Sequence, residues 1–340
     1  MRQDYNIQEL RKDSFNAKIF PSRVLEWIAK ENLWNIWVPR SYGGLEMSFS
    51  EGLEKLKYLA GIDGSLGWTI TLCSGANFFI GNLKTEVAEE IFLNTEKPVC
   101  FGGSGGVFGT AEKTGNHYKI SGTWKYATGA PYLTHFTLNA AIWENGTEMK
   151  NPDGTPLIRS FIIPAANVTV IEDWNSMGLK ATVTHSFEVK EEVITEKYSF
   201  VYNQTFLPQP IFKIHFSVFA DLTLWVNYIG MAQHFLEEAR NFATADKLKN
   251  LKKILFNSNV QIGKFSEEIE QIIKIEGVFQ EEYIQNIHKQ ATASVRDLSK
   301  EIIQVYPSLG IKACAEDQRL NQIFRDYFTA TQHHIFTRTE

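Results

Sequence analysis

Apolar residues recur every three or four positions through the last 130 residues of the chain, which is the spacing of one buried face of a helix. Phe219, Leu222, Val226 and Ile229 form such a series. Residues 211–340 also hold only one of the ten prolines and four of the 23 glycines. Because both residue types interrupt helices, their scarcity favours long helices here. We predict about four helices packed as a bundle.

The first hundred residues show the same periodicity in shorter stretches, separated by Pro and Gly. A helix begins after the Gly43-Gly44 turn, and Pro98 follows the last apolar stretch. Four helices are predicted, over residues 24–30, 49–59, 66–79 and 86–93.

Residues 101–201 have a different pattern, with short β-branched and aromatic runs between Gly, Asn and Pro. Such runs are typical of strands, and Asn151-Pro152-Asp153-Gly154 is typical of a turn. The strand-like runs are 118–120, 136–138, 160–163 and 186–189. We therefore predict an α+β protein with a helical N-terminal lobe (1–98), a central antiparallel β-barrel or sandwich (99–210) and a C-terminal four-helix bundle (211–340).

Composition indicates which partners and which cellular compartment to expect for this protein. The chain is 44% hydrophobic, has a net charge of −5 and has no dense basic run, so nucleic acid is not an expected partner. Cys73, Cys100 and Cys314 are far apart, and the start of the chain has no signal-peptide core. No stretch of 18 apolar residues indicates a membrane helix. We expect a soluble cytoplasmic protein without a metal site, since the eight histidines show no metal-ligand spacing.

The segment with the most informative chemistry runs from Gly122 to Gly129 and reads Gly-Thr-Trp-Lys-Tyr-Ala-Thr-Gly. Alternating aromatic residues also occur in ordinary core strands. The segment nevertheless resembles the flavin-contacting strand of the acyl-CoA dehydrogenase superfamily. That resemblance implies that Tyr126 lies beside the flavin ring and that the Thr128 hydroxyl lies near flavin N5. It makes Trp124 and Gly129 further candidates for cofactor binding.

Other segments resemble this superfamily in the same order, across roughly residues 30–336. Their order makes the resemblance much more specific than a single motif. The segments are Trp37 to Gly44, Asp63 to Trp68, Ile163-Pro164, Met177 to Thr182, and Arg325-Asp326.

The residues after Arg325 indicate a branch of the superfamily. Common acyl-CoA dehydrogenases have a catalytic Glu nine residues after this Arg, where the present chain has His334. The flavin-dependent monooxygenase branch has a catalytic His eight residues after it, which corresponds to His333. An imidazole titrates near neutral pH and suits oxygen chemistry, whereas removal of a thioester α-proton requires a carboxylate. Both histidines are catalytic candidates, although a frayed helix end is the alternative interpretation.

Two further segments bear on the cofactor and the substrate. The loop from Phe101 to Gly109 lacks the dehydrogenase pattern, and residues 253–257 only partly match the motif that holds the adenylate half of FAD. The resemblance therefore implies flavin, either FMN or FAD, supplied in reduced form. Ser104 in this loop and His185 near the Met177 motif are candidates for substrate binding.

These observations favour a reduced-flavin monooxygenase acting on a small organic molecule, with a separate flavin reductase as partner. One alternative is an acyl-CoA dehydrogenase that uses FAD and a relocated base, Glu237 or Glu238. The other is a non-catalytic family member, which would fit the incomplete adenylate motif and the end of the chain at Glu340. The family implies a homodimer or homotetramer.

Overall fold

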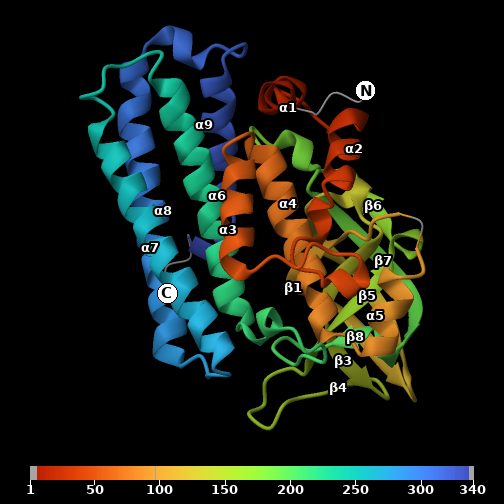
Figure 1. The fold of residues 1–340 in the computed structure, drawn as a ribbon. Helices are drawn as coiled ribbons and strands as arrows, with labels where there is room; N and C mark the ends of the chain where they lie inside the picture. Colours follow the sequence, from red (N-terminus) through yellow and green to blue (C-terminus); the bar gives the residue numbers. More distant parts are fainter. Residues whose placement is uncertain (1–5, 96, 337–340) are drawn as a thin grey trace.

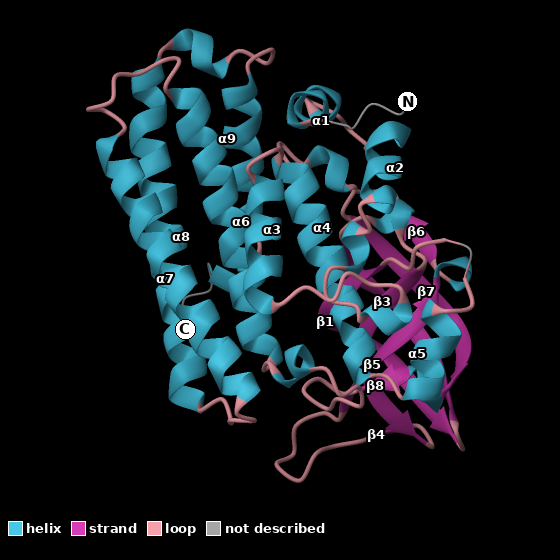
Figure 2. Cartoon of the chain, in the orientation of Figure 1, coloured by secondary structure: helices cyan, strands magenta, loops and turns pink. Residues whose placement is uncertain are grey.

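The structure is a computed structural model that describes residues 6–95 and 97–336. Figure 1 shows three layers side by side: a twisted sheet, a central pair of helices (α3 and α4), and a bundle of long helices. Figure 2 shows the sheet on one side of the molecule and most of the helical part on the other. This is a mixed α+β fold, as predicted.

All four helices predicted before residue 98 are present, and one further helix precedes them. Their bounds are α1 Ile7–Ser14, α2 Ser22–Lys30, α3 Phe49–Ala60, α4 Gly64–Asn77 and α5 Thr85–Phe92. Helix α4 carries no charged residue and is buried on nearly all sides, because it packs between strand β1 and helix α6. Asp63 caps its N-terminus by accepting a hydrogen bond from the Leu66 amide at 2.9 Å.

The C-terminal region contains four long helices: α6 Phe216–Ala239, α7 Lys249–Lys274, α8 Glu281–Val305 and α9 Arg319–Ala330. Helix α6 lies against the other three and also against α3 and α4.

Within residues 6–95 and 97–336, none of the helices combines the length and apolar character that a membrane crossing needs. The domain boundaries at residues 98 and 210 stay a prediction.

Helices α3 and α6 approach closely at Gly230. A Cβ atom there would lie 2.2 Å from the Lys57 carbonyl oxygen and 2.8 Å from the Ala60 Cβ. Gly263 in the middle of α7 has nothing within 4 Å of the same position. The two helical glycines therefore differ in the space available to a side chain.

We expect Gly230→Ala to lower the free energy of unfolding by about 1–3 kcal/mol, because the added methyl group forces α3 away from α6. Gly263→Ala, the matched control, should instead gain up to about 1 kcal/mol from helix propensity. Urea unfolding of both variants checks this. Equal effects of the two substitutions would contradict the close approach.

The sheet has eight strands in the order β6-β7-β2-β1-β3-β5-β8, with β4 paired to β3. In the part of the chain that the structure describes, β6 and β8 are the two edges of the sheet and do not pair with each other, so the predicted barrel is not found there. The prediction of an all-antiparallel sheet is also wrong, since β3 runs parallel to β1. The bounds are β1 Phe101–Thr114, β2 His117–Ala127, β3 His135–Glu144, β4 Thr147–Glu148, β5 Ile158–Pro164, β6 Thr169–Ile171, β7 His185–Thr195 and β8 Ser199–Phe200.

The sheet curls so that strands that are not neighbours meet. The Trp124 indole N–H on β2 donates to the Asn139 carbonyl on β3 at 2.9 Å, although β1 lies between these strands. The Trp124 ring also stacks on Phe187 of β7, which in turn contacts Phe136 of β3. These buried aromatic rings form the core of the β region.

A loop after β6 is fastened to α9 by two adjacent residues. The Arg325 guanidinium donates to the Met177 carbonyl at 2.8 Å, and the Asp326 carboxylate accepts from the Leu179 amide at 2.6 Å. Gly178 lies between them, where a Cβ would come within 2.2 Å of the Arg325 backbone. Two of the sequence motifs are thus the two sides of one contact.

Asp326 also belongs to a buried group that joins α9 to the start of α4. The Gln322 amide N–H₂ donates to Asp63 at 2.8 Å and to Asp326 at 3.3 Å. Burial raises the pKa of Asp63 from 3.8 to about 6. Burial, followed by the nearby Asp63 charge, raises the pKa of Asp326 from 3.8 to about 7. Both raised pKa values show that the folded chain disfavours the state in which Asp63 and Asp326 are charged at the same time.

We expect the free energy of unfolding to fall, by on the order of a few kcal/mol, as pH rises from about 4 to 7. A carboxyl whose pKa is higher in the folded chain binds more protons there than in the unfolded chain, so its stabilising contribution is lost through this range. Asp326→Asn should flatten the decline, because Asp63 then has no neighbouring charge. Urea unfolding at pH 4.5–8 checks this, with exposed Asp317→Asn as the control. Parallel curves for wild type and Asp326→Asn would contradict it.

Candidate functional site

A cavity of about 880 Å³ lies where the sheet meets helices α4 and α6 and the residues that follow α9. Its lining combines segments that are more than 200 residues apart in the sequence. The main lining groups are residues 102–106 and 137–139 of the sheet, Lys125, Tyr126 and Thr128 at the end of β2, Trp68 to Ala76 of α4 with Phe79 just after it, Phe216 to Leu224 of α6, and Thr329 to Ile335. Segments predicted separately from the sequence therefore share one space.

The sheet wall contains three of the predicted site residues. Tyr126 lines the cavity with a ring that is 45% exposed and meets Trp174 edge-on at 6.1 Å between centroids. Thr128 lines it with a mostly buried side chain whose hydroxyl contacts that of Thr184 at 3.1 Å. Ser104 also lines the cavity, but its hydroxyl donates to the Lys125 carbonyl at 2.9 Å. An aromatic face and hydroxyl groups thus meet at this wall.

The opposite wall brings His333 into the same cavity. Its ring meets the Trp68 ring edge-on, with 5.6 Å between centroids and 71° between planes. The His333 amide donates to the Ala330 carbonyl at 2.9 Å, which continues the last turn of α9. The second histidine candidate, His334, has a side chain outside the described part of the structure.

Part of the cavity lining is a cluster of aromatic rings, with a small polar group beside it. Tyr202 stacks on Phe79 with 5.2 Å between ring centroids and meets Phe216 at a tilt of 34° with 4.7 Å between centroids, and all three residues line the cavity. The Asn139 amide nitrogen donates to the Tyr202 hydroxyl at 3.3 Å, and the Ser160 hydroxyl donates to the Asn139 side-chain oxygen at 2.6 Å. Burial raises the pKa of Tyr202, so its hydroxyl keeps its proton.

Three other predicted site residues lie outside the cavity lining. Trp124 is fully buried in the core of the curled sheet. Gly129 follows Thr128 in the left-handed conformation, with φ +74°, and its amide donates to the Thr182 carbonyl at 2.8 Å. His185 accepts from the Trp174 amide at 3.0 Å through Nδ1, so it helps to orient a residue that does line the cavity.

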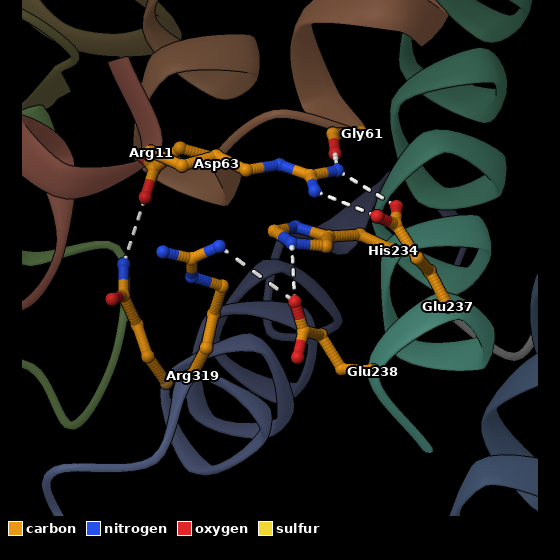
Figure 3. Close-up of polar contacts among 8 residues, drawn as sticks. Arg11, Gly61, Asp63, His234, Glu237, Glu238 and Arg319 are labelled. Atoms are coloured by element: carbon orange, nitrogen blue, oxygen red, sulfur yellow. Dashed lines mark hydrogen bonds and ion pairs between the residues drawn. The ribbon is translucent and has the colours of Figure 1, made fainter. Parts of the chain in front are cut away.

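The two alternative glutamates belong to a separate polar cluster. Figure 3 shows Glu237 paired with Arg11, while Glu238 approaches His234 and Arg319. The two terminal guanidinium nitrogens of Arg11 each donate to Glu237 at 2.7 Å. Burial lowers the pKa of His234 to about 3. Among the described residues that line the cavity, none is Asp or Glu. A relocated carboxylate base is therefore not found there.

Several lining residues had no signal that sequence reasoning could use. Tyr202 and Asn139 lie in segments without a recognised motif, and the apolar side chains of Trp68 and Phe79 are typical of core residues in predicted helices. Trp68 and Phe79 are both core and lining residues, since each is more than 90% buried and also borders the cavity. In the described part of the chain, no group of three or more His, Cys, Asp or Glu side chains is placed to hold a metal ion.

No family model matches the chain. Indole-3-acetate monooxygenase from Pseudomonas putida is 28% identical over 224 residues, covering 65% of this chain and 55% of that protein. The oxygenase component of an FADH2-dependent resorcinol hydroxylase from Rhizobium sp. is 26% identical over 183 residues, covering 54% and 42%. The chain thus spans about half the length of these relatives, 55% of the first and 42% of the second.

Solved structures match over nearly the whole chain. XiaF from Streptomyces sp., in complex with FADH2 and glycerol, superposes with a TM-score of 0.86 at 18% identity and covers 97% of this chain and 89% of that one. The resemblance inferred from sequence is confirmed: the relatives and structural neighbours of this chain are oxygenase components of flavin-dependent two-component monooxygenases, which have the acyl-CoA dehydrogenase-like fold, and this chain has the same fold.

Proposed function

We propose that the chain binds a reduced flavin in the cavity between the sheet and the helices, and uses it with dioxygen to oxygenate a small aromatic compound. The observation that carries this proposal is the meeting of Tyr126, Thr128 and His333 around one cavity. The names of the relatives support the reaction class.

The cavity walls fit a flat heterocycle with polar edges. Tyr126 offers an exposed ring face, and aromatic rings stack well on one another. Thr128 offers a hydroxyl oxygen, and Gly105 has no heavy atom within 4 Å of its Cβ position, so the backbone there can approach a ligand. The volume of about 880 Å³ leaves room for a small substrate beside the ring system.

A bound reduced flavin supplies the electrons that activate dioxygen. In this proposal His333 holds or moves a proton at a ring nitrogen, and Trp68 fixes the plane of the imidazole. The buried aromatic residues of the lining exclude water from the reacting groups. The lack of a carboxylate among the described lining residues favours this chemistry over dehydrogenation of a thioester, which requires a strong base.

The aromatic part of the cavity lining, formed by Phe79, Phe216 and Tyr202, is the proposed substrate subsite. Phe79, Phe216 and Tyr202 would contact an aromatic ring. The Tyr202 hydroxyl donates to the Asn139 side-chain oxygen at 3.4 Å, and it would turn from this long bond to donate to an oxygen atom of the substrate. The names of the two relatives indicate indole-3-acetate and resorcinol, which both combine an aromatic ring with oxygen. A separate reductase is the proposed partner, because one relative is described as an oxygenase component.

The proposed function is tested by mixing the protein first with reduced FMN or FAD, and then with oxygen and either indole-3-acetate or resorcinol. We expect reduced flavin to bind more tightly than oxidised flavin. His333→Ala should lower product formation by about 10²- to 10⁴-fold and divert oxygen to hydrogen peroxide, because proton transfer is lost. Reduced-flavin affinity should stay within a few fold. Anaerobic titration, product chromatography and peroxide assay measure these quantities.

His117→Ala is the matched control, since His117 is an exposed histidine at the start of β2. It should keep full product formation. Tight binding of oxidised FAD, bleached by a CoA thioester, would instead establish a dehydrogenase. Failure of both redox forms to bind would establish the non-catalytic alternative.

The substrate subsite is tested with Tyr202→Phe, which keeps the stacked ring and removes the hydroxyl. For a substrate with an oxygen on its ring, KM should rise about fivefold, the equivalent of one hydrogen bond of about 1 kcal/mol. Flavin affinity should not change, because in this proposal Tyr202 contacts the substrate and Thr128 the flavin. An unchanged KM across oxygen-bearing substrates, measured by initial rates, would remove Tyr202 from substrate recognition.

A further inference from the structure

Three threonine hydroxyls form a row that leads from the cavity wall into the protein. The Thr128 and Thr184 oxygens are 3.1 Å apart, and the Thr184 and Thr182 oxygens are 2.7 Å apart. Thr182 then contacts the Leu179 carbonyl oxygen at 2.7 Å. Thr128 and Thr184 line the cavity, whereas Thr182 is completely buried.

The number of hydrogen atoms fixes the direction of every bond in this row. The Leu179 carbonyl has no hydrogen to give, so the Thr182 hydroxyl must donate to it. Thr182 has then used its one hydrogen, so Thr184 must donate to Thr182. By the same argument Thr128 must donate to Thr184. The three contacts consume the three hydroxyl hydrogens, so none is left to donate to a molecule in the cavity.

The end of the row is held in place by other contacts. The Leu179 amide donates to Asp326 at 2.6 Å, and the Trp174 indole donates to the Leu179 carbonyl at 3.0 Å. Leu179 and Val183 have φ values of +49° and +39°, which are unfavourable for non-glycine residues. Such backbone conformations persist where the surrounding contacts enforce them. The carbonyl that receives the row is therefore well fixed.

We propose that Thr182 and Thr184 are positioning residues that leave Thr128 able only to accept a hydrogen bond from a ligand. This inference rests on the proposed function and on the family resemblance, which implies that the Thr128 hydroxyl lies near flavin N5. Oxidised flavin has a bare nitrogen at N5 and needs a donor there, whereas reduced flavin carries an N–H that needs an acceptor. The row of threonines thus selects the reduced form.

The test is the ratio of the dissociation constants for oxidised and reduced FMN, measured by anaerobic titration. Thr184→Val removes the acceptor of the Thr128 hydrogen, which can then turn to oxidised FMN. Reduced FMN loses its fixed acceptor, so the ratio should fall about tenfold, as expected for roughly one hydrogen bond gained or lost. Thr184→Ser, the matched control, keeps the hydroxyl and should keep the ratio within about twofold.

Thr182→Val gives an independent measure, because Thr182 does not line the cavity. The Thr184 hydrogen would then turn to Thr128, whose own hydrogen is released toward the ligand, so the ratio should fall in this variant also. Ordinary loss of packing would weaken both redox forms alike and leave the ratio unchanged. An unchanged ratio in both valine variants, with reduced FMN still bound, would overturn the inference alone. If wild type binds neither form, the proposed function fails, and this inference fails with it.

Discussion

Two carboxylates buried within reach of one glutamine amide are the constraint on which the arrangement of the layers depends. Asp63 comes from the start of α4 and Asp326 from α9, and Gln322 donates to both. Each carboxylate also accepts a backbone amide, from Leu66 or Leu179, which offsets part of the cost of burial. The contact requires tight backbone approach, since a Cβ at Gly64 would lie 2.8 Å from the Asp326 Cβ. The central layer, the bundle and the loop from the sheet are therefore fastened at one point.

This junction connects the two walls of the cavity. The loop held by Arg325 and Asp326 carries Leu179 and leads into Thr184, which belong to the sheet wall. Helix α9 continues directly into His333 on the opposite wall. Both walls are attached to α9: the loop of the sheet wall is hydrogen-bonded to Arg325 and Asp326, and His333 follows the end of the helix. A shift of this helix would therefore move the hydroxyl row and the imidazole together. The contact between this loop and α9 thus determines how the threonine hydroxyls lie relative to the His333 imidazole.

The order of helices and strands could be predicted from the sequence because periodicity and the distribution of Pro and Gly are local signals. Family-like spacing also located Tyr126, Thr128 and His333, which now line one cavity. Strand direction could not be predicted, because alternation is the same for parallel and antiparallel strands, and β3 lies parallel to β1. Trp124 looked equivalent to Tyr126 in the same segment, but the curl of the sheet buries it against Phe187. Tyr202 reaches the cavity only through tertiary packing, so no local pattern indicated it.

The Leu179 peptide group separates the titrating junction from the cavity. Its N–H donates to Asp326, whose pKa is raised by burial, and its carbonyl accepts from Thr182 at the end of the hydroxyl row. A peptide group neither gains nor loses a proton near neutral pH, so protonation of Asp326 cannot pass along the row as a proton. The junction can transmit only a change of position. Because every hydrogen in the row is already committed, the acceptor character of Thr128 persists for as long as Leu179 keeps its place.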